Sequence, residues 1–129
     1  MPTYVSLCKW TEQGVQNARE STRRAEQAKA AVRKLGGKLT TILWTQGNYD
    51  LIAISDFPDE ESAMAFLLTL GGQGNVRTET LRAYSAQDME RIFAKMGGAG
   101  AGAGAGAGTS AGAGSPAGSG AAKKSAAKR

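Results

Sequence analysis

Residues 38–56 read KLTTILWTQGNYDLIAISD, with two apolar runs separated by a polar segment. Residues 38–44 are rich in β-branched and apolar side chains, and residues 50–56 contain the apolar run LIAI. Runs of this kind are typical of β-strands, and the polar sequence Thr45-Gln46-Gly47-Asn48 between them is typical of a turn. The stretch therefore predicts a β-hairpin.

Residues 3–10, before the hairpin, predict another strand. Successive side chains of a strand point to opposite faces. One face holds Val5 and Leu7. The other face holds Tyr4, Ser6, Cys8 and Trp10. Because both sets contain apolar side chains, the pattern suits a strand that is covered on both faces.

Residues 11–37 predict a short helical turn over 11–18, with Thr11 as its N-cap, and then a long helix. Ser21 or Thr22 is the expected N-cap of the long helix, and Gly36-Gly37 is its expected stop. Apolar residues recur along this helix at helical spacing: Ala25, Ala28, Val32 and Leu35. Its basic residues, mixed with glutamates, predict a solvated outer face, with an anionic partner as the alternative.

The residues after the hairpin predict a second long helix, a fourth strand and a closing helix. Asp59 is the expected N-cap of the second long helix, and the glycine-rich residues 71–74 are its expected stop. The side chains expected to point inward from it are Ala63, Phe66, Leu67 and Leu70. Residues 76–84 alternate like a strand, and residues 86–96 predict a short helix.

The element order β-α-β-β-α-β is typical of the ferredoxin-like fold, an α+β fold in which two helices cover one face of a four-stranded antiparallel sheet. The other face of such a sheet is left uncovered. We expect that face to be apolar, with Trp10, Trp44, Tyr4 and Ile42 on it. Since large exposed apolar patches mark interaction sites, we predict a homodimer formed through this face, a dimeric α+β barrel.

The composition changes abruptly at Gly97. Residues 1–96 hold twelve basic and all eleven acidic residues, whereas residues 97–129 consist mainly of 11 glycines and 12 alanines. Side chains this small bury too little surface to offset the entropy of ordering the backbone. We therefore predict a domain over residues 1–96 and a disordered Ala/Gly-rich tail over residues 97–129. The basic residues of the tail are Lys123, Lys124, Lys128 and Arg129.

The tail has two interpretations. Its four positive charges predict weak, salt-sensitive attachment to nucleic acid without sequence preference. Alternatively, the tail is a passive or solubilising spacer, natural or engineered.

The chain of 129 residues has one cysteine and no histidine. This composition excludes imidazole general bases, Ser-His-Asp and Cys-His pairs, and any His- or Cys-rich zinc site, and we expect no metal and no cofactor. One cysteine cannot form an intrachain disulfide, and the N-terminus lacks the pattern of a signal peptide. No apolar run approaches the roughly 18 to 20 residues of a membrane span. We therefore expect a cytoplasmic protein without membrane contact.

Two segments resemble a known family. They are Trp44-Thr45-Gln46-Gly47-Asn48-Tyr49-Asp50 and Gly74-Asn75-Val76-Arg77-Thr78-Glu79-Thr80-Leu81-Arg82-Ala83. Together with Tyr4-Val5-Ser6-Leu7, Trp10-Thr11, Gly14 and Gly36-Gly37-Lys38, they resemble the GYD-domain family over about residues 1–96. The resemblance implies a small bacterial protein of the dimeric α+β barrel group, whose relatives include cofactor-free monooxygenases, isomerases and ligand-sensing modules. It implies no established activity.

Candidate ligand-binding residues lie in these two segments. Tyr49 and Asp50 begin the third strand, and Arg77 stands beside Thr78 and Thr80 on the last strand. If the side chains converge, Asp50 is a general base or hydrogen-bond acceptor, Tyr49 a donor to an oxyanion, and Arg77 an anion clamp. Alternatively, Asp50 accepts turn amides or pairs with a basic side chain, and Tyr49 caps the sheet edge.

Trp10 and Trp44 are further candidates, because they either line an apolar ligand cavity or fill the dimer core. Cys8 is expected to be a small buried residue, since no histidine is present to activate its thiol. We predict a small-molecule-binding homodimer that acts as a sensor or accessory subunit. The alternative is a cofactor-independent enzyme, similar to a monooxygenase or isomerase, that acts on an apolar metabolite.

Overall fold

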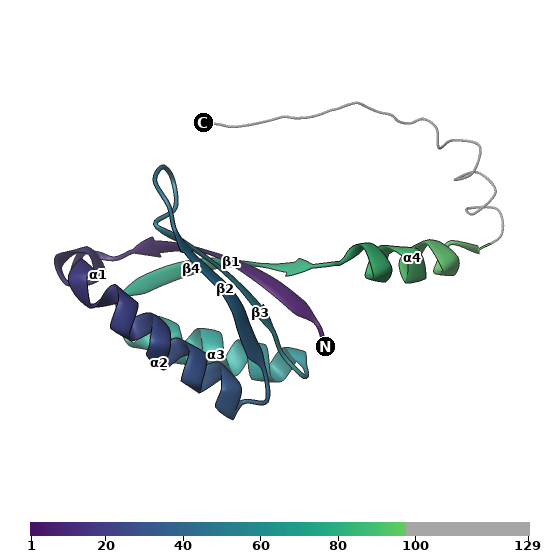
Figure 1. Cartoon of the computed structure of the whole chain (residues 1–129), viewed down its shortest axis with the longest axis horizontal. Helices are drawn as coiled ribbons and strands as arrows, with labels where there is room; N and C mark the ends of the chain where they lie inside the picture. The colour runs from purple at the N-terminus through teal and green to yellow at the C-terminus, as the bar shows by residue number, and fades with distance from the viewer. Residues whose placement is uncertain (98–129) are drawn as a thin grey trace. The chain divides into compact units, whose positions relative to one another are not determined.

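The computed structural model describes residues 1–97, and its elements follow the predicted order (Figure 1). The strands are β1 (Thr3–Trp10), β2 (Lys38–Trp44), β3 (Leu51–Asp56) and β4 (Val76–Ala83). The helices are α1 (Glu12–Gln16), the 3-10 turn η1 (Ala18–Glu20), α2 (Ser21–Lys34), α3 (Glu60–Gly72) and α4 (Ala86–Lys95). None of the helices in the described part of the chain is long and apolar enough to cross a membrane.

The chain divides into two compact units, Met1–Ala83 and Tyr84–Arg129. The first contains the sheet and α1 to α3, and the described part of the second contains α4. A boundary at residue 96 stays a prediction. The predictions for the tail, including the role of its four basic residues, concern residues that lie outside the described range, apart from Gly97.

The sheet has the strand order β2-β3-β1-β4, and every neighbouring pair is antiparallel. β1 and β3 are therefore central, and β4 pairs with β1. Helices α2 and α3 lie on the same face of the sheet (Figure 1). This arrangement confirms the ferredoxin-like α+β fold.

The assignment of side chains to the two faces of the sheet was wrong. Tyr4 packs against the core cluster under the helices, and the Trp44 indole Nε1 donates to the Ser21 hydroxyl of α2 at 3.0 Å. Trp10 and Ile42 line a cavity between the sheet and the helices. All four aromatic and aliphatic residues expected on the uncovered face thus lie on the covered one.

The alternation of β1 could not reveal which face the helices cover, because both faces carry apolar side chains. In the structure the helices cover the face with the small residues Ser6 and Cys8, which are 8% and 6% exposed. The opposite face, which no helix of the unit Met1–Ala83 covers, also carries apolar side chains, beside the charged Lys9, Arg77 and Glu79. The strand registers place these aliphatic side chains on it: Val5, Leu7, Leu43, Ile52, Ile54 and Leu81.

The core lies between α2, α3 and the sheet. Val32, Phe57, Ala63 and Phe66 form its buried centre. The Phe57 ring lies 6.0 Å from the Tyr4 ring and 5.8 Å from the Phe66 ring, measured between centroids. At these distances aromatic rings contact each other edge-on or tilted, which adds to the free energy gained from burial.

The predicted N-caps are confirmed for two helices and wrong for one. Thr11 accepts from the Gly14 amide at 3.0 Å, and Asp59 accepts from the Ser62 amide at 2.7 Å. The hydrogen bonds from Ser62 hold the pKa of Asp59 below its ordinary value. Helix α2 begins differently, because η1 leads directly into it. Ser21 is therefore its first residue rather than its cap, and the Ser21 hydroxyl bonds to Trp44 instead.

Candidate functional site

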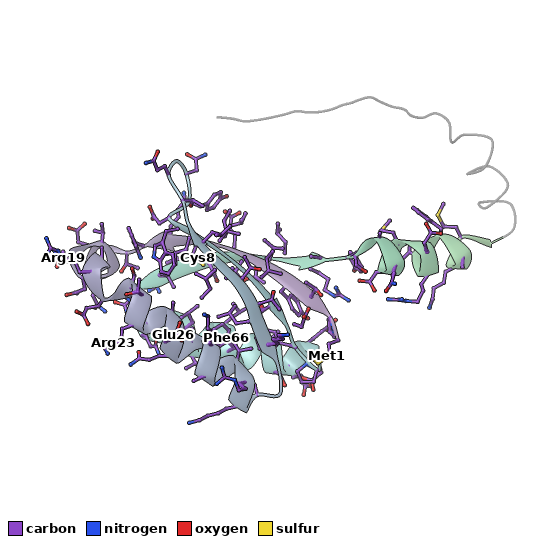
Figure 2. The ribbon with its side chains drawn as sticks, in the orientation of Figure 1. Met1, Cys8, Arg19, Arg23, Glu26 and Phe66 are labelled. Carbon is purple, nitrogen blue, oxygen red and sulfur yellow. The ribbon has the colours of Figure 1, made fainter. Side chains whose placement is uncertain are left out.

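A cavity of about 120 Å³ lies between α2, α3 and the covered face of the sheet. Its walls include Cys8 from β1 and Phe66 from α3, which are both labelled in Figure 2. The cavity exists because small side chains face one another where larger ones would meet: Ala25, Ala28 and Ala31 on α2 and Ala53 on β3. The space they leave open is predominantly apolar.

Two buried hydrogen-bond donors in the cavity wall have no partner among the described residues. They are the indole Nε1 of Trp10 and the Nη2 of Arg24. Buried polar groups are almost always paired, so two unpaired donors in one cavity are unusual. Arg24 is nevertheless held in place, because its Nη1 donates to the Asn17 carbonyl at 2.9 Å.

Three other polar side chains of the wall, those of Ser6, Asn75 and Ser21, have partners. The hydroxyls of Ser6 and Thr80 lie 3.0 Å apart, and Asn75 Oδ1 accepts from Gln13 Nε2 at 3.0 Å. Ser21 accepts from Trp44, as described above. The donors of Trp10 and Arg24 differ from these three side chains, because they are buried and have no partner among the described residues.

Cys8 behaves as a buried apolar residue, as predicted. Burial raises the pKa of its thiol to about 11. Because only the thiolate is a strong nucleophile, the thiol is unreactive near neutral pH. Among residues 1–97, no three His, Cys, Asp or Glu side chains lie close enough together to hold a metal ion.

The Gly-x-Tyr-Asp turn connects the hairpin to β1. Gly47 has a φ of 105°, a conformation that favours glycine. The Asp50 carboxylate accepts from the Trp10 backbone amide at 2.8 Å, and the Asp50 amide donates to the Cys8 carbonyl at 2.8 Å. Asp50 thus bonds to backbone amides and carbonyls, which fits the structural interpretation of this residue better than the catalytic one.

Tyr49 reaches the last strand. Its hydroxyl donates to Glu79 Oε1 at 2.5 Å, and this bond raises the pKa of the phenol. The ammonium group of Lys9 lies 5.5 Å from the centre of the Tyr49 ring. Tyr49 therefore meets Glu79 and Lys9, two residues that were not among the sequence-based candidates.

The structure does not bring Arg77 to Tyr49 or Asp50. Its Nη1 donates to the Gly71 carbonyl at 2.9 Å and to the Val76 carbonyl at 3.0 Å, which ties the end of α3 to β4. Thr78 and Thr80 pair with Cys8 and Ser6 of β1. Of the two tryptophans, Trp10 lines the 120 Å³ cavity, whereas Trp44 borders a separate shallow groove.

Arg24 is the site residue that the sequence interpretation missed. It was grouped with the other basic residues of α2 on a solvated face. Figure 2 shows Arg23 pointing away from the sheet, whereas Arg24 lies in the cavity wall. A signal was present, because Arg24, Ala28 and Ala31 are spaced i, i+4 and i+7 and so share one side of the helix.

Comparisons with known proteins identify the family. No curated protein matches the chain. A crystal structure of TTHA0845 from Thermus thermophilus is 25% identical, with a TM-score of 0.43, over 67% of this chain and 96% of its own. The family model described as the GYD domain matches residues 4–93, which include the Gly-x-Tyr-Asp turn, and the chain therefore belongs to the GYD-domain family.

Proposed function

We propose that this protein binds a small, largely apolar molecule in the cavity between α2, α3 and the sheet, as a sensor or accessory subunit. The cavity itself is the observation that carries the proposal. The cavity is partly open and its lining is predominantly apolar, so the empty cavity leaves apolar surface in contact with water, which costs free energy. A bound apolar molecule would fill it and restore the missing contacts.

Binding is better supported than catalysis. A cofactor-independent enzyme needs an ionisable group in its cavity that can take or give a proton near neutral pH. Cys8 is in the wall, but its raised pKa keeps it protonated. The carboxylate of Asp50 and the hydroxyl of Tyr49 are engaged with a backbone amide and with Glu79. These contacts favour a binding site.

Fluorobenzene tests the proposed cavity, because it has the size of one ring and carries no charge. We expect saturable binding to the full chain, seen as broadening of the fluorine NMR line. Ala28→Leu places a larger side chain in the cavity and should abolish the broadening. Ala65→Leu is the matched control, because Ala65 is an exposed helical residue outside the cavity, and it should bind like the wild type. Equal binding by both variants, or none by the wild type, would contradict the proposal.

We also propose that the protein is a homodimer formed through the uncovered apolar face of the sheet. Leu43 and Leu81 on this face are 58% and 52% exposed in the single chain, and Val5, Leu7, Ile52 and Ile54 lie between them. Apolar faces of this kind are typical of protein interfaces. A second copy of the same face is its natural partner, because most oligomers are closed and symmetric.

Leu81→Glu should convert the dimer into a monomer. A carboxylate buried in an apolar interface loses its hydration, and we expect the dimer Kd to rise at least about 30-fold. Leu68→Glu on α3 is the control, because Leu68 is 65% exposed and belongs to a helix rather than to this face. Sedimentation velocity at micromolar concentration measures the dimer fraction of the wild type and of both variants. A monomeric wild type, or a dimeric Leu81→Glu variant, would refute the interface.

We propose two further properties from the sequence, one for the basic tail and one for the location of the protein in the cell. The basic tail residues would give weak, salt-sensitive attachment to nucleic acid, and the same charges allow a purely solubilising role. The cytoplasmic location is supported by the single cysteine, which offers no partner for a disulfide within the chain.

A further inference from the structure

We infer that the cavity selects an anionic ligand, a small monocarboxylate whose apolar body fills the space and whose carboxylate meets Trp10 and Arg24. The inference rests on the proposed function, since it names the class of ligand for the same cavity. It is carried by an independent observation, the two buried donors without partners among the described residues.

Both unpaired groups can only donate hydrogen bonds. An indole Nε1 has one hydrogen and no acceptor, and a guanidinium has five hydrogens and no acceptor. A ligand that satisfies both must therefore supply acceptor atoms. Leaving such donors buried and unpaired costs free energy, which a ligand with two acceptor oxygens would recover.

The charge of Arg24 indicates the charge of the ligand. Arginine carries a positive charge, and no carboxylate of residues 1–97 forms an ion pair with Arg24. The neighbouring Arg23 differs, because it pairs with Glu20. A charge that is partly buried without a counterion favours an anionic ligand over a neutral one.

The two donors are held before any ligand arrives. Asn17 accepts from Arg24 Nη1 and in turn donates from its own side chain to the Gln13 carbonyl at 2.9 Å. The Trp10 backbone is fixed by Asp50 at 2.8 Å. Donors fixed in this way lose little freedom on binding, which raises affinity.

The size and lining of the cavity define the rest of the ligand. An apolar cavity of about 150 Å³ accommodates benzene, so a partly open cavity of about 120 Å³ limits the apolar body of the ligand to about one ring or a short branched chain. The alanine-rich wall offers such a body apolar contacts. Strongly hydrated anions such as inorganic phosphate gain nothing from that wall. The chemistry therefore fits small aromatic or branched-chain monocarboxylates.

A charge series of nearly equal size tests this inference on the full chain. The probes are 4-fluorobenzoate, 4-fluorobenzamide and 4-fluorobenzamidine, followed by fluorine NMR. We expect 4-fluorobenzoate to bind at least about 10-fold more tightly than the amide, and the cationic amidine not to bind. Equal affinities for the three probes would overturn the inference. This test uses only the wild-type protein and needs no variant.

Three variants test whether Arg24 and Trp10 cause the preference for the anionic probe. Arg24→Met should weaken 4-fluorobenzoate binding at least about 30-fold, because it removes the positive charge from the cavity wall. Arg23→Met is the matched control, because it removes the same charge from the same helix outside the cavity. Trp10→Phe removes the indole N–H and keeps an aromatic ring, and it should weaken 4-fluorobenzoate by about 3- to 10-fold. Retention of full 4-fluorobenzoate affinity by Arg24→Met would refute the assignment.

The outcomes separate this inference from the proposed function. If fluorobenzene binds but the charge of the probe makes no difference, the anionic preference is wrong and the apolar cavity remains. If neither fluorobenzene nor 4-fluorobenzoate binds, both are wrong.

Discussion

Replacement of Phe57 by alanine is expected to lower the free energy of unfolding by about 3 to 5 kcal/mol, the cost of deleting a buried aromatic ring. Phe57 is 2% exposed, and its ring contacts the rings of Tyr4 and Phe66. It also lies in the linker between β3 and α3, where its amide donates to the Pro2 carbonyl at 3.0 Å. The ring thus packs β1 against α3, and no neighbouring side chain can easily replace it.

Urea unfolding at 25 °C measures this effect. Phe57→Leu keeps most of the volume and should cost less than half as much as alanine. Leu68→Ala should change stability by less than about 0.5 kcal/mol, because Leu68 is 65% exposed. If Phe57→Ala cost no more than Leu68→Ala, the core described here would be wrong.

The strands were predictable because their sequence signals are local. Residues 3–10 and 38–44 were predicted as strands, and β1 and β2 have these bounds. The turn between β2 and β3 was also predictable, since Gly47 provides the positive φ that the turn needs. The pairing of β1 with both β3 and β4 followed from the order of the elements alone.

The faces of the sheet were not predictable from the same signals. A strand with Val5 and Leu7 on one side and Tyr4 and Trp10 on the other is apolar on both, so periodicity shows that the faces differ but not which one the helices cover. We expected the largest side chains on the uncovered face. The helices instead cover the face that has the small residues Ser6 and Cys8 at its centre, which are 8% and 6% exposed.

The site depended on contacts between residues far apart in the sequence. Asp50 bonds to the backbone of Trp10, forty positions earlier, and Tyr49 bonds to Glu79, thirty positions later. Such pairs follow from strand register, which sequence periodicity alone does not determine. Trp10 was found as a candidate because it is a large aromatic on a strand, whereas Arg24 was missed because a charged residue on an amphipathic helix is normally solvated.

Gly14 permits a close approach between α1 and the loop that precedes β4. It lies buried in α1, and a Cβ at this position would stand 1.9 Å from the Asn75 carbonyl oxygen and 3.1 Å from Trp10 Cδ1. The same Asn75 oxygen accepts from the Thr11 amide at 3.0 Å, and the Thr11 hydroxyl donates to the Gly74 carbonyl at 2.5 Å. The start of α1 and the loop before β4 are therefore fixed to each other, with no room for a methyl group.

Gly14→Ala should consequently destabilise the protein by about 3 kcal/mol in urea unfolding, because the clash is with backbone and the Thr11 bonds must lengthen. The gain of about 1 kcal/mol in helix propensity from alanine is smaller than this cost. Gly72→Ala is the control, since a Cβ there meets nothing within 4 Å and should leave stability unchanged or raise it by up to about 1 kcal/mol. The indole of Trp10 should also shift, so at 4-fluorobenzoate concentrations that saturate the wild type, the folded Gly14→Ala variant should bind less. Stability within about 0.5 kcal/mol of the wild type would show that α1 and the Asn75 loop separate at little cost, and the fixed position of Trp10 would then lose its structural basis.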